Sequence, residues 1–238
     1  PGDCKIGDKI MIDDGKVTVE VSEVNGNDVV TKVIHPGAVS NNKGLNLPGV
    51  AVSVPAMSEK DVADLRWGLK AGADFIALSF VRNASDVKDV HKIMDEVGIR
   101  IPVIAKIEKP QAVANLQEIV DAFDGIMVAR GDLGVELPIE DVPMVQKRCI
   151  TMARESAKPV IVATQMLDSM ITNSSPTRAE ATDCANAVLD GADALMLSGE
   201  TSVGAFAIET VKTMARIIFK SVPIIKELKT SVLPLEYL

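Results

Sequence analysis

Charged side chains follow two successive apolar runs, and their types suit chemistry on a phosphorylated substrate. Lys106 and Glu108 end the run that begins at Val103, and because they are two apart in an extended segment, their side chains point the same way. Asp132 follows Gly131 just after the next apolar run. Two carboxylates beside a lysine predict a magnesium-type site with open positions for water and phosphate. The lysine would neutralise charge on a transferring phosphoryl group or an enolate.

The same residues also have an ordinary structural interpretation, which spacing alone does not exclude. Lys106 and Glu108 could form a salt-bridged rim, with Asp132 capping the next helix. Gly131 allows close backbone approach to a ligand near a helix N-terminus, but it also suits a simple turn. Thr164 ends a strand of Val and Ile, where a β-branched residue is common.

The elements that must position these side chains alternate between short apolar runs and helical patterns. The apolar runs cover residues 75–80, 103–105, 126–128, 160–162 and 194–197. Their spacing of roughly 25 to 35 residues accommodates a strand, a loop and a crossover helix. Such strands predict a parallel sheet covered on both faces, with polar residues at the strand ends. A (β/α)8 barrel and a doubly wound sheet both fit. A barrel needs eight strands and these are five, so the chain is either an open sheet or part of a larger protein.

Two further patterns locate the start of this alternation. Residues 9–33 alternate apolar and polar side chains between Asn/Asp-Gly turns, which predicts a small antiparallel meander. Ser58 and Asp61 form a capping-box pattern that predicts a helix running through Leu69, with Gly72 as its stop.

Composition excludes several classes of protein. The 25 Lys and Arg residues against 33 Asp and Glu give a net charge of −8, which argues against a general nucleic-acid binder. An aromatic content of 3% leaves few rings on which bases could stack. Three distant cysteines, with no CxxC pair, predict reduced thiols in a cytoplasmic protein. No signal peptide and no membrane-spanning run are recognised, so we expect no membrane partner.

Several blocks of the sequence, in order and at matching spacing, resemble the pyruvate kinase family. The blocks are Lys43-Gly44-Leu45-Asn46-Leu47-Pro48-Gly49, Ile104-Ala105-Lys106-Ile107-Glu108, Met127-Val128-Ala129-Arg130-Gly131-Asp132-Leu133-Gly134, Ala163-Thr164-Gln165-Met166-Leu167, Pro176-Thr177-Arg178-Ala179-Glu180, and residues 186–201. They extend along nearly the whole chain, and together they are far more specific than any one of them.

The resemblance implies a partial (β/α)8 TIM barrel of class α/β that carries part of an inserted all-β lid domain. Residues 1–52 would be the later part of the lid. Residues 53–221 would be barrel units four to eight, the C-terminal portion of the catalytic domain. Residues 222–238 would lead to a regulatory domain that is absent here. The full-length protein is expected to be a homotetramer.

The resemblance also implies roles for the strand-end residues. Lys106 would stabilise the phosphoryl group in flight and the enolate, and Glu108 and Asp132 would bind Mg²⁺ or Mn²⁺. The backbone amides of Gly131 and Asp132, with Thr164, would hold the carboxylate of phosphoenolpyruvate or pyruvate. Thr164 would also orient the proton relay that protonates the enolate.

The implied reaction transfers phosphate from phosphoenolpyruvate to ADP and gives pyruvate and ATP. Lys43 matches a lid lysine that approaches the nucleotide phosphates. The family's K⁺ requirement is inferred from the resemblance alone, because the corresponding residues belong to early strands that have no counterpart here. For the same reason we expect the isolated 238 residues to be inactive.

Two alternatives remain open on the sequence. A magnesium-dependent aldolase or lyase acting on pyruvate or another oxyacid also places Glu and Asp at successive strand ends. The second alternative is a non-catalytic remnant that binds metal and oxyacid or that serves assembly. Consumption of phosphoenolpyruvate with ADP distinguishes the kinase from both.

Overall fold

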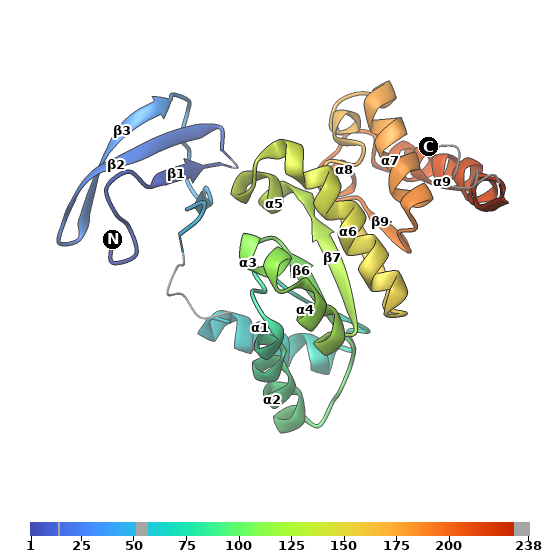
Figure 1. The fold of residues 1–238 in the computed structure, drawn as a ribbon, viewed down its shortest axis with the longest axis horizontal. Helices are drawn as coiled ribbons and strands as arrows, with labels where there is room; N and C mark the ends of the chain where they lie inside the picture. The colour runs from blue at the N-terminus through green and yellow to red at the C-terminus, as the bar shows by residue number, and fades with distance from the viewer. Residues whose placement is uncertain (14, 51–56, 231–238) are drawn as a thin grey trace, which may run out of the picture. The chain divides into compact units, whose positions relative to one another are not determined.

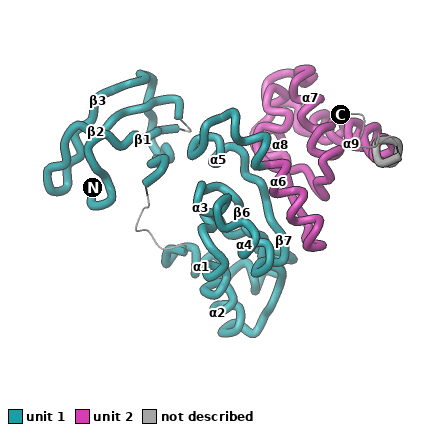
Figure 2. Tube along the Cα trace, in the orientation of Figure 1, with its two compact units in different colours: residues 1–145 teal, residues 146–238 magenta. Residues whose placement is uncertain are grey.

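The computed structural model describes residues 1–13, 15–50 and 57–230, with side chains up to residue 225. The chain divides into two compact units, residues 1–145 and residues 146–238 (Figure 2). Each unit is described by itself below. The predicted domain boundary at residue 52 falls in the segment 51–56, outside the described residues.

The first unit begins with a small antiparallel sheet, as the alternating pattern predicted. Its strands are β1 (Lys9–Ile12), β2 (Val17–Asn25), β3 (Asp28–His35) and β4 (Leu45–Asn46), in the order β3-β2-β1-β4. Val17, Val19 and Val21 of β2 are buried, so one face of this sheet carries its own apolar cluster. Gly26 turns the chain between β2 and β3 at φ 59°, a conformation that glycine adopts without steric cost. The two-residue strand β4 was not predicted.

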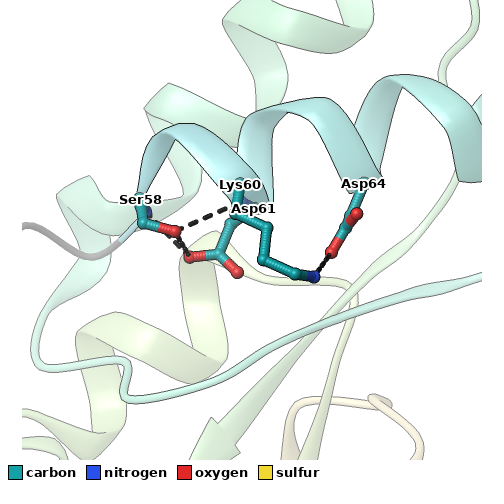
Figure 3. Close-up of polar contacts among 4 residues, drawn as sticks. All are labelled: Ser58, Lys60, Asp61 and Asp64. Carbon is teal, nitrogen blue, oxygen red and sulfur yellow. Dashed lines mark hydrogen bonds and ion pairs between the residues drawn. The ribbon is translucent and has the colours of Figure 1, made fainter.

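Helix α1 (Glu59–Ala71) confirms the capping-box prediction (Figure 3). The hydroxyl of Ser58 accepts a hydrogen bond from the backbone N–H of Asp61, and the Asp61 carboxylate accepts one from the N–H of Ser58 at 2.8 Å. Lys60 forms an ion pair with Asp64 one turn along. Gly72 ends the helix in the left-handed conformation at φ 85°, as expected for a C-terminal glycine.

Three parallel strands form the centre of the first unit. They are β5 (Ile76–Leu78), β6 (Val103–Ile107) and β7 (Gly125–Ala129), with β5 at the edge and β6 between the other two. The helices between and after them are α2 (Val87–Val97), α3 (Pro110–Ala114), α4 (Leu116–Ala122) and α5 (Arg130–Glu136). Every residue of β7 is buried, which is typical of a parallel strand covered on both faces. Helices α1 and α2 pack on each other (Figure 1).

The second unit repeats the alternation of strand and helix. Helix α6 (Val142–Glu155) begins in the last residues of the first unit, and most of its residues belong to the second. Strands β8 (Val160–Ala163) and β9 (Ala194–Met196) are parallel and directly paired. The helices around them are α7 (Arg178–Asp190), α8 (Gly199–Ser202) and α9 (Ala207–Thr230). Helix α9 continues past the predicted tail boundary at residue 222.

The predicted apolar strands and their parallel pairing are therefore confirmed within each unit. Short 3₁₀ turns at Ala84–Asp86, Ile139–Asp141 and Asp168–Ile171 complete the connections. Within the described residues, no helix is both long and apolar enough to cross a bilayer.

Candidate active site

The ion pair between Lys106 and Glu108 lies at the carboxyl end of β6. The two side chains lie on the same side of the chain, as their spacing predicted, and Lys106 Nζ lies 2.6 Å from Glu108 Oε1. Lys106 Nζ also donates a hydrogen bond of 3.0 Å to Ser79 Oγ, just after β5. The Lys106 side chain is 24% exposed, whereas that of Glu108 is 0% exposed. Burial on this scale of a carboxylate demands compensation by charge or hydrogen bonds.

Phe80 supplies one of these hydrogen bonds and is itself in an unusual conformation. Its backbone N–H donates to Glu108 Oε2 at 2.6 Å, and its φ is +56°. A non-glycine residue at positive φ is uncommon and persists where the surroundings impose it. The loop after β5 is thus shaped to present its amide to Glu108.

The second oxygen of Glu108 has a lysine as its partner instead of a backbone group. Oε1 is buried, and its contact is the ion pair with Lys106 Nζ at 2.6 Å. A buried carboxylate oxygen with spare lone pairs beside a partly exposed lysine is suited to a hard cation or to a ligand that such a cation bridges. The position of this oxygen therefore fits the predicted metal role of Glu108.

Gly131 and Asp132 lie in the first turn of α5, directly after β7. Ile107 pairs with Val128 in register, so Glu108 and the start of α5 leave the sheet at the same end. The first turn of an α-helix presents backbone N–H groups that suit an anion. The structure thus brings Asp132 to the same strand ends as Lys106 and Glu108.

A second buried carboxylate, which sequence reasoning missed, ties α5 to the loop after β6. Glu136 has a side chain 2% exposed and pairs with Lys109 Nζ at 2.6 Å. Asn46 of β4 donates a hydrogen bond of 3.3 Å to the same Glu136 oxygen. Lys109 also lies over the ring of Phe80, 5.4 Å from its centre. The connection spans segments far apart in the sequence, so no local pattern could have revealed it.

Lys43 lies in the loop between β3 and β4 and pairs with Asp13 at 2.9 Å. Hydrogen bonds from Lys43 and then Lys16 lower the pKa of Asp13 below its usual value. The Lys43 side chain is 33% exposed, so it is held by an acidic partner but still reaches solvent. The structure does not show a site around it.

In the second unit, Thr164 follows β8 rather than forming part of it. Thr164 and Gln165 have φ of +75° and +53°. Positive φ is a genuine outlier for a β-branched residue, and such strain gathers at functional sites. The ordinary interpretation of Thr164 as a strand residue does not account for this backbone.

Glu200, in helix α8 of the second unit, is another buried carboxylate that sequence reasoning did not single out. Its side chain is almost fully buried, and its two oxygens accept backbone hydrogen bonds from Leu167 at 3.3 Å and Ser198 at 2.7 Å. Glu200 therefore joins the loop after β8 to the loop after β9. The side chain of Ser198 makes no hydrogen bond that caps the N-terminus of α8.

The cysteines are free, as predicted. Burial raises the pKa of Cys149 to about 12, so this thiol is protonated at neutral pH and unsuited to nucleophilic chemistry. Cys184 is also buried and donates weakly to the Met166 carbonyl.

The donor set around Glu108 suits Mg²⁺ bound jointly with a substrate. Within the described residues, no three His, Cys, Asp or Glu side chains cluster in a way that could hold a metal. Mg²⁺ does not need such a cluster, because it commonly takes one or two carboxylates and completes its shell with water and substrate phosphate.

Comparison with known proteins identifies the family. The sequence profile described as "Pyruvate kinase, barrel domain" matches residues 1–211. The chain is 67% identical over 216 residues to the pyruvate kinase of Corynebacterium glutamicum, covering 91% of this chain and 46% of that protein. It is 65% identical to the Mycobacterium tuberculosis enzyme over the same length and shares, and 51% identical to that of Geobacillus stearothermophilus over 222 residues, 92% of this chain and 38% of that one.

The chain belongs to the pyruvate kinase family. It spans about half the length, or less, of these curated relatives. All three relatives are named pyruvate kinase, which gives no support to the aldolase or lyase alternative.

Proposed function

We propose that these residues form part of a pyruvate kinase that transfers phosphate from phosphoenolpyruvate to ADP, giving pyruvate and ATP. The observation that carries the proposal is the Lys106–Glu108 pair, in which a fully buried carboxylate lies beside a partly exposed lysine, in a chain of this family.

Lys106 acts on the negative charge that develops during transfer. Its ammonium group is held by Ser79 and Glu108 but remains partly exposed, so it can approach a phosphoryl or enolate oxygen. A fixed cation in a partly desolvated site stabilises such charge without reorganising at the moment of reaction.

Glu108 and Asp132 would hold the divalent metal, Mg²⁺ or Mn²⁺. When bound, the ion supplies Lewis-acid stabilisation of substrate oxygens. The chain's own contribution is to hold Glu108 with the Phe80 amide and to fix α5, which carries Asp132, through Glu136 and Lys109.

The remaining predicted residues have narrower roles in the proposal. The Gly131 and Asp132 amides, in the first turn of α5, bind the substrate carboxylate, and Thr164 shares that role and orients the proton relay. Support for Thr164 is its strained backbone. Lys43 approaches the nucleotide phosphates. To do so, it would leave Asp13 and pair with a phosphate instead.

The finer architecture is part of the same proposal. Residues 1–52 belong to an all-β lid, residues 53–221 to a partial (β/α)8 barrel, and residues 222–238 lead toward a further domain. The whole protein is a cytoplasmic homotetramer that also uses K⁺. The alternation of parallel strands and helices supports the barrel, and the antiparallel sheet of residues 9–46 supports the lid.

The direct test is pyruvate formation from phosphoenolpyruvate and ADP by the longest natural polypeptide that contains these residues. We expect turnover that requires a divalent metal. Absence of pyruvate with either Mg²⁺ or Mn²⁺ and added K⁺ contradicts the proposal. The 238-residue chain alone serves as the incomplete control, for which we expect no turnover.

A further inference from the structure

An aspartate directly before a strand pairs with the first residue of the preceding strand in both units. In the first unit, Val103 donates its N–H to Asp124 Oδ2 at 2.8 Å, and the Asp124 N–H donates back to the Val103 carbonyl at 3.0 Å. In the second unit, Val160 and Asp193 make the same two hydrogen bonds, both at 2.9 Å. We call this two-way contact an aspartate clamp.

The clamps occur at alternate strands. Asp124 precedes β7 and Asp193 precedes β9, whereas Pro102 and Pro159 stand directly before β6 and β8. In the order β5, β6, β7, β8, β9, an aspartate precedes every second strand, and β5 belongs to the same set as β7 and β9. The residue before the apolar run that contains β5 is Asp74. The alternation thus predicts a third clamp at Asp74.

Local geometry supports the equivalence of Asp74 and Asp193. Each follows a Gly-Ala pair whose glycine ends a helix at positive φ, 85° at Gly72 and 106° at Gly191. In each pair the alanine N–H donates to a carbonyl five residues back, at 3.1 and 3.0 Å respectively. The two helix-to-strand connections therefore have the same construction.

The partner of Asp74 is what differs. Asp74 makes no hydrogen bond with any described residue, and β5 lies at the edge of its sheet.

A groove of about 410 Å³ borders β5 and is lined by Leu65, Phe75, Ile76 and Ala77 among others. Phe75 is 60% exposed, an unusual state for an aromatic residue beside a parallel strand. An edge of this kind is a template for a further strand.

We propose that Asp74 sets the register of the parallel strand that a (β/α)8 barrel places at the edge of β5, by clamping the first residue of that strand. The Asp74 carboxylate accepts the backbone N–H of that residue, and the Asp74 N–H donates to its carbonyl. The strand comes from the protein's own polypeptide outside residues 1–238, since the curated relatives are about twice as long as this chain. The presence of this strand rests on the partial barrel proposed above, and the role of Asp74 in setting its register is what the clamps add.

The test replaces Asp74 in the longest natural polypeptide that contains these residues. Asp74→Ala is compared with Asp124→Ala, which removes an observed clamp, and with Asp89→Ala, which changes an exposed aspartate of α2. Thermal unfolding and residue-resolved amide hydrogen exchange are measured. Asp74→Asn is included because it keeps one oxygen acceptor in a side chain of nearly the same size.

We expect Asp74→Ala to lower Tm about as much as Asp124→Ala does. We also expect roughly tenfold or faster exchange at one amide outside residues 1–238, at the start of the strand beside β5. Asp74→Asn should produce a smaller rise at the same amide. The proposal is overturned if Asp74→Ala behaves like Asp89→Ala, if the affected amide lies within residues 1–238, or if the effect depends on protein concentration, which would indicate a strand from a second copy.

Discussion

Glu108 in the first unit and Glu200 in the second are both buried carboxylates near strand ends, yet their surroundings differ. Each accepts a backbone N–H from the loop after another strand, Phe80 for Glu108 and Leu167 for Glu200. Glu200 has a second backbone donor for its other oxygen, in Ser198. The other oxygen of Glu108 has only the ion pair with Lys106.

The difference separates a structural carboxylate from a functional one. When backbone groups satisfy both oxygens, the side chain fixes loops and has little capacity left for a ligand. When one oxygen is paired with a partly exposed lysine and not with the backbone, it keeps a lone pair. A bound cation and substrate would use that lone pair.

The largest expected effect comes from Lys106→Met in the full-length protein. Loss of the ammonium group that pairs with Glu108 should lower kcat by about 10²–10³-fold or more, with Mn²⁺ affinity largely retained. Steady-state kinetics and a separate metal titration measure the two quantities. Lys88→Met, an exposed lysine on α2, is the matched control. Unchanged turnover in Lys106→Met would remove this lysine from the mechanism.

Glu200→Gln should affect stability more than Glu108→Gln does. A glutamine at 200 places an NH₂ group against a backbone donor and loses a charge-assisted hydrogen bond, for a cost of about 2 kcal/mol in unfolding free energy. At 108 a glutamine can keep the hydrogen bond from Phe80, and Lys106 retains Ser79 and solvent contact. Urea unfolding of the two variants measures this. A larger loss at 108 would contradict the distinction drawn between the two sites.

Glu180 gives the smallest expected effect and concerns pH. Burial raises its pKa, but hydrogen bonds from Ser169 and Thr177 outweigh burial, so the pKa lies below its usual value of 4.5. Its contribution to stability is therefore fully present above pH 4.5 and is lost as pH falls through the lower, folded-state pKa. Glu180→Gln should cost up to about 1 kcal/mol at pH 7 and progressively less as pH falls below 4.5. A cost that stays constant as pH falls, in chemical unfolding, would show that the charge of Glu180 is not involved.

Local patterns predicted the elements well where the controlling contacts are themselves local. The capping box at Ser58, the stop at Gly72 and the shared direction of Lys106 and Glu108 all follow from spacings of a few residues. The parallel pairing followed from fully apolar strands separated by helices.

The parts that were not predicted depend on contacts between distant segments. The burial of Glu136 and Glu200 needs donors from other loops, and β4 exists only because residues 45–46 reach β1. The positive φ of Phe80 and Thr164 opposes their intrinsic preference, so only tertiary context can impose it.

The most direct test of a metal role for Glu108 is the Mn²⁺ dissociation constant of the full-length protein, measured by electron paramagnetic resonance with no nucleotide present. Wild type is compared with Glu108→Gln and with Glu200→Gln, which removes the charge of the fully satisfied carboxylate. We predict that Glu108→Gln weakens Mn²⁺ binding by at least about tenfold, as expected for loss of a ligand, whereas Glu200→Gln binds as wild type does. Equal affinity in all three proteins would contradict the metal site proposed here.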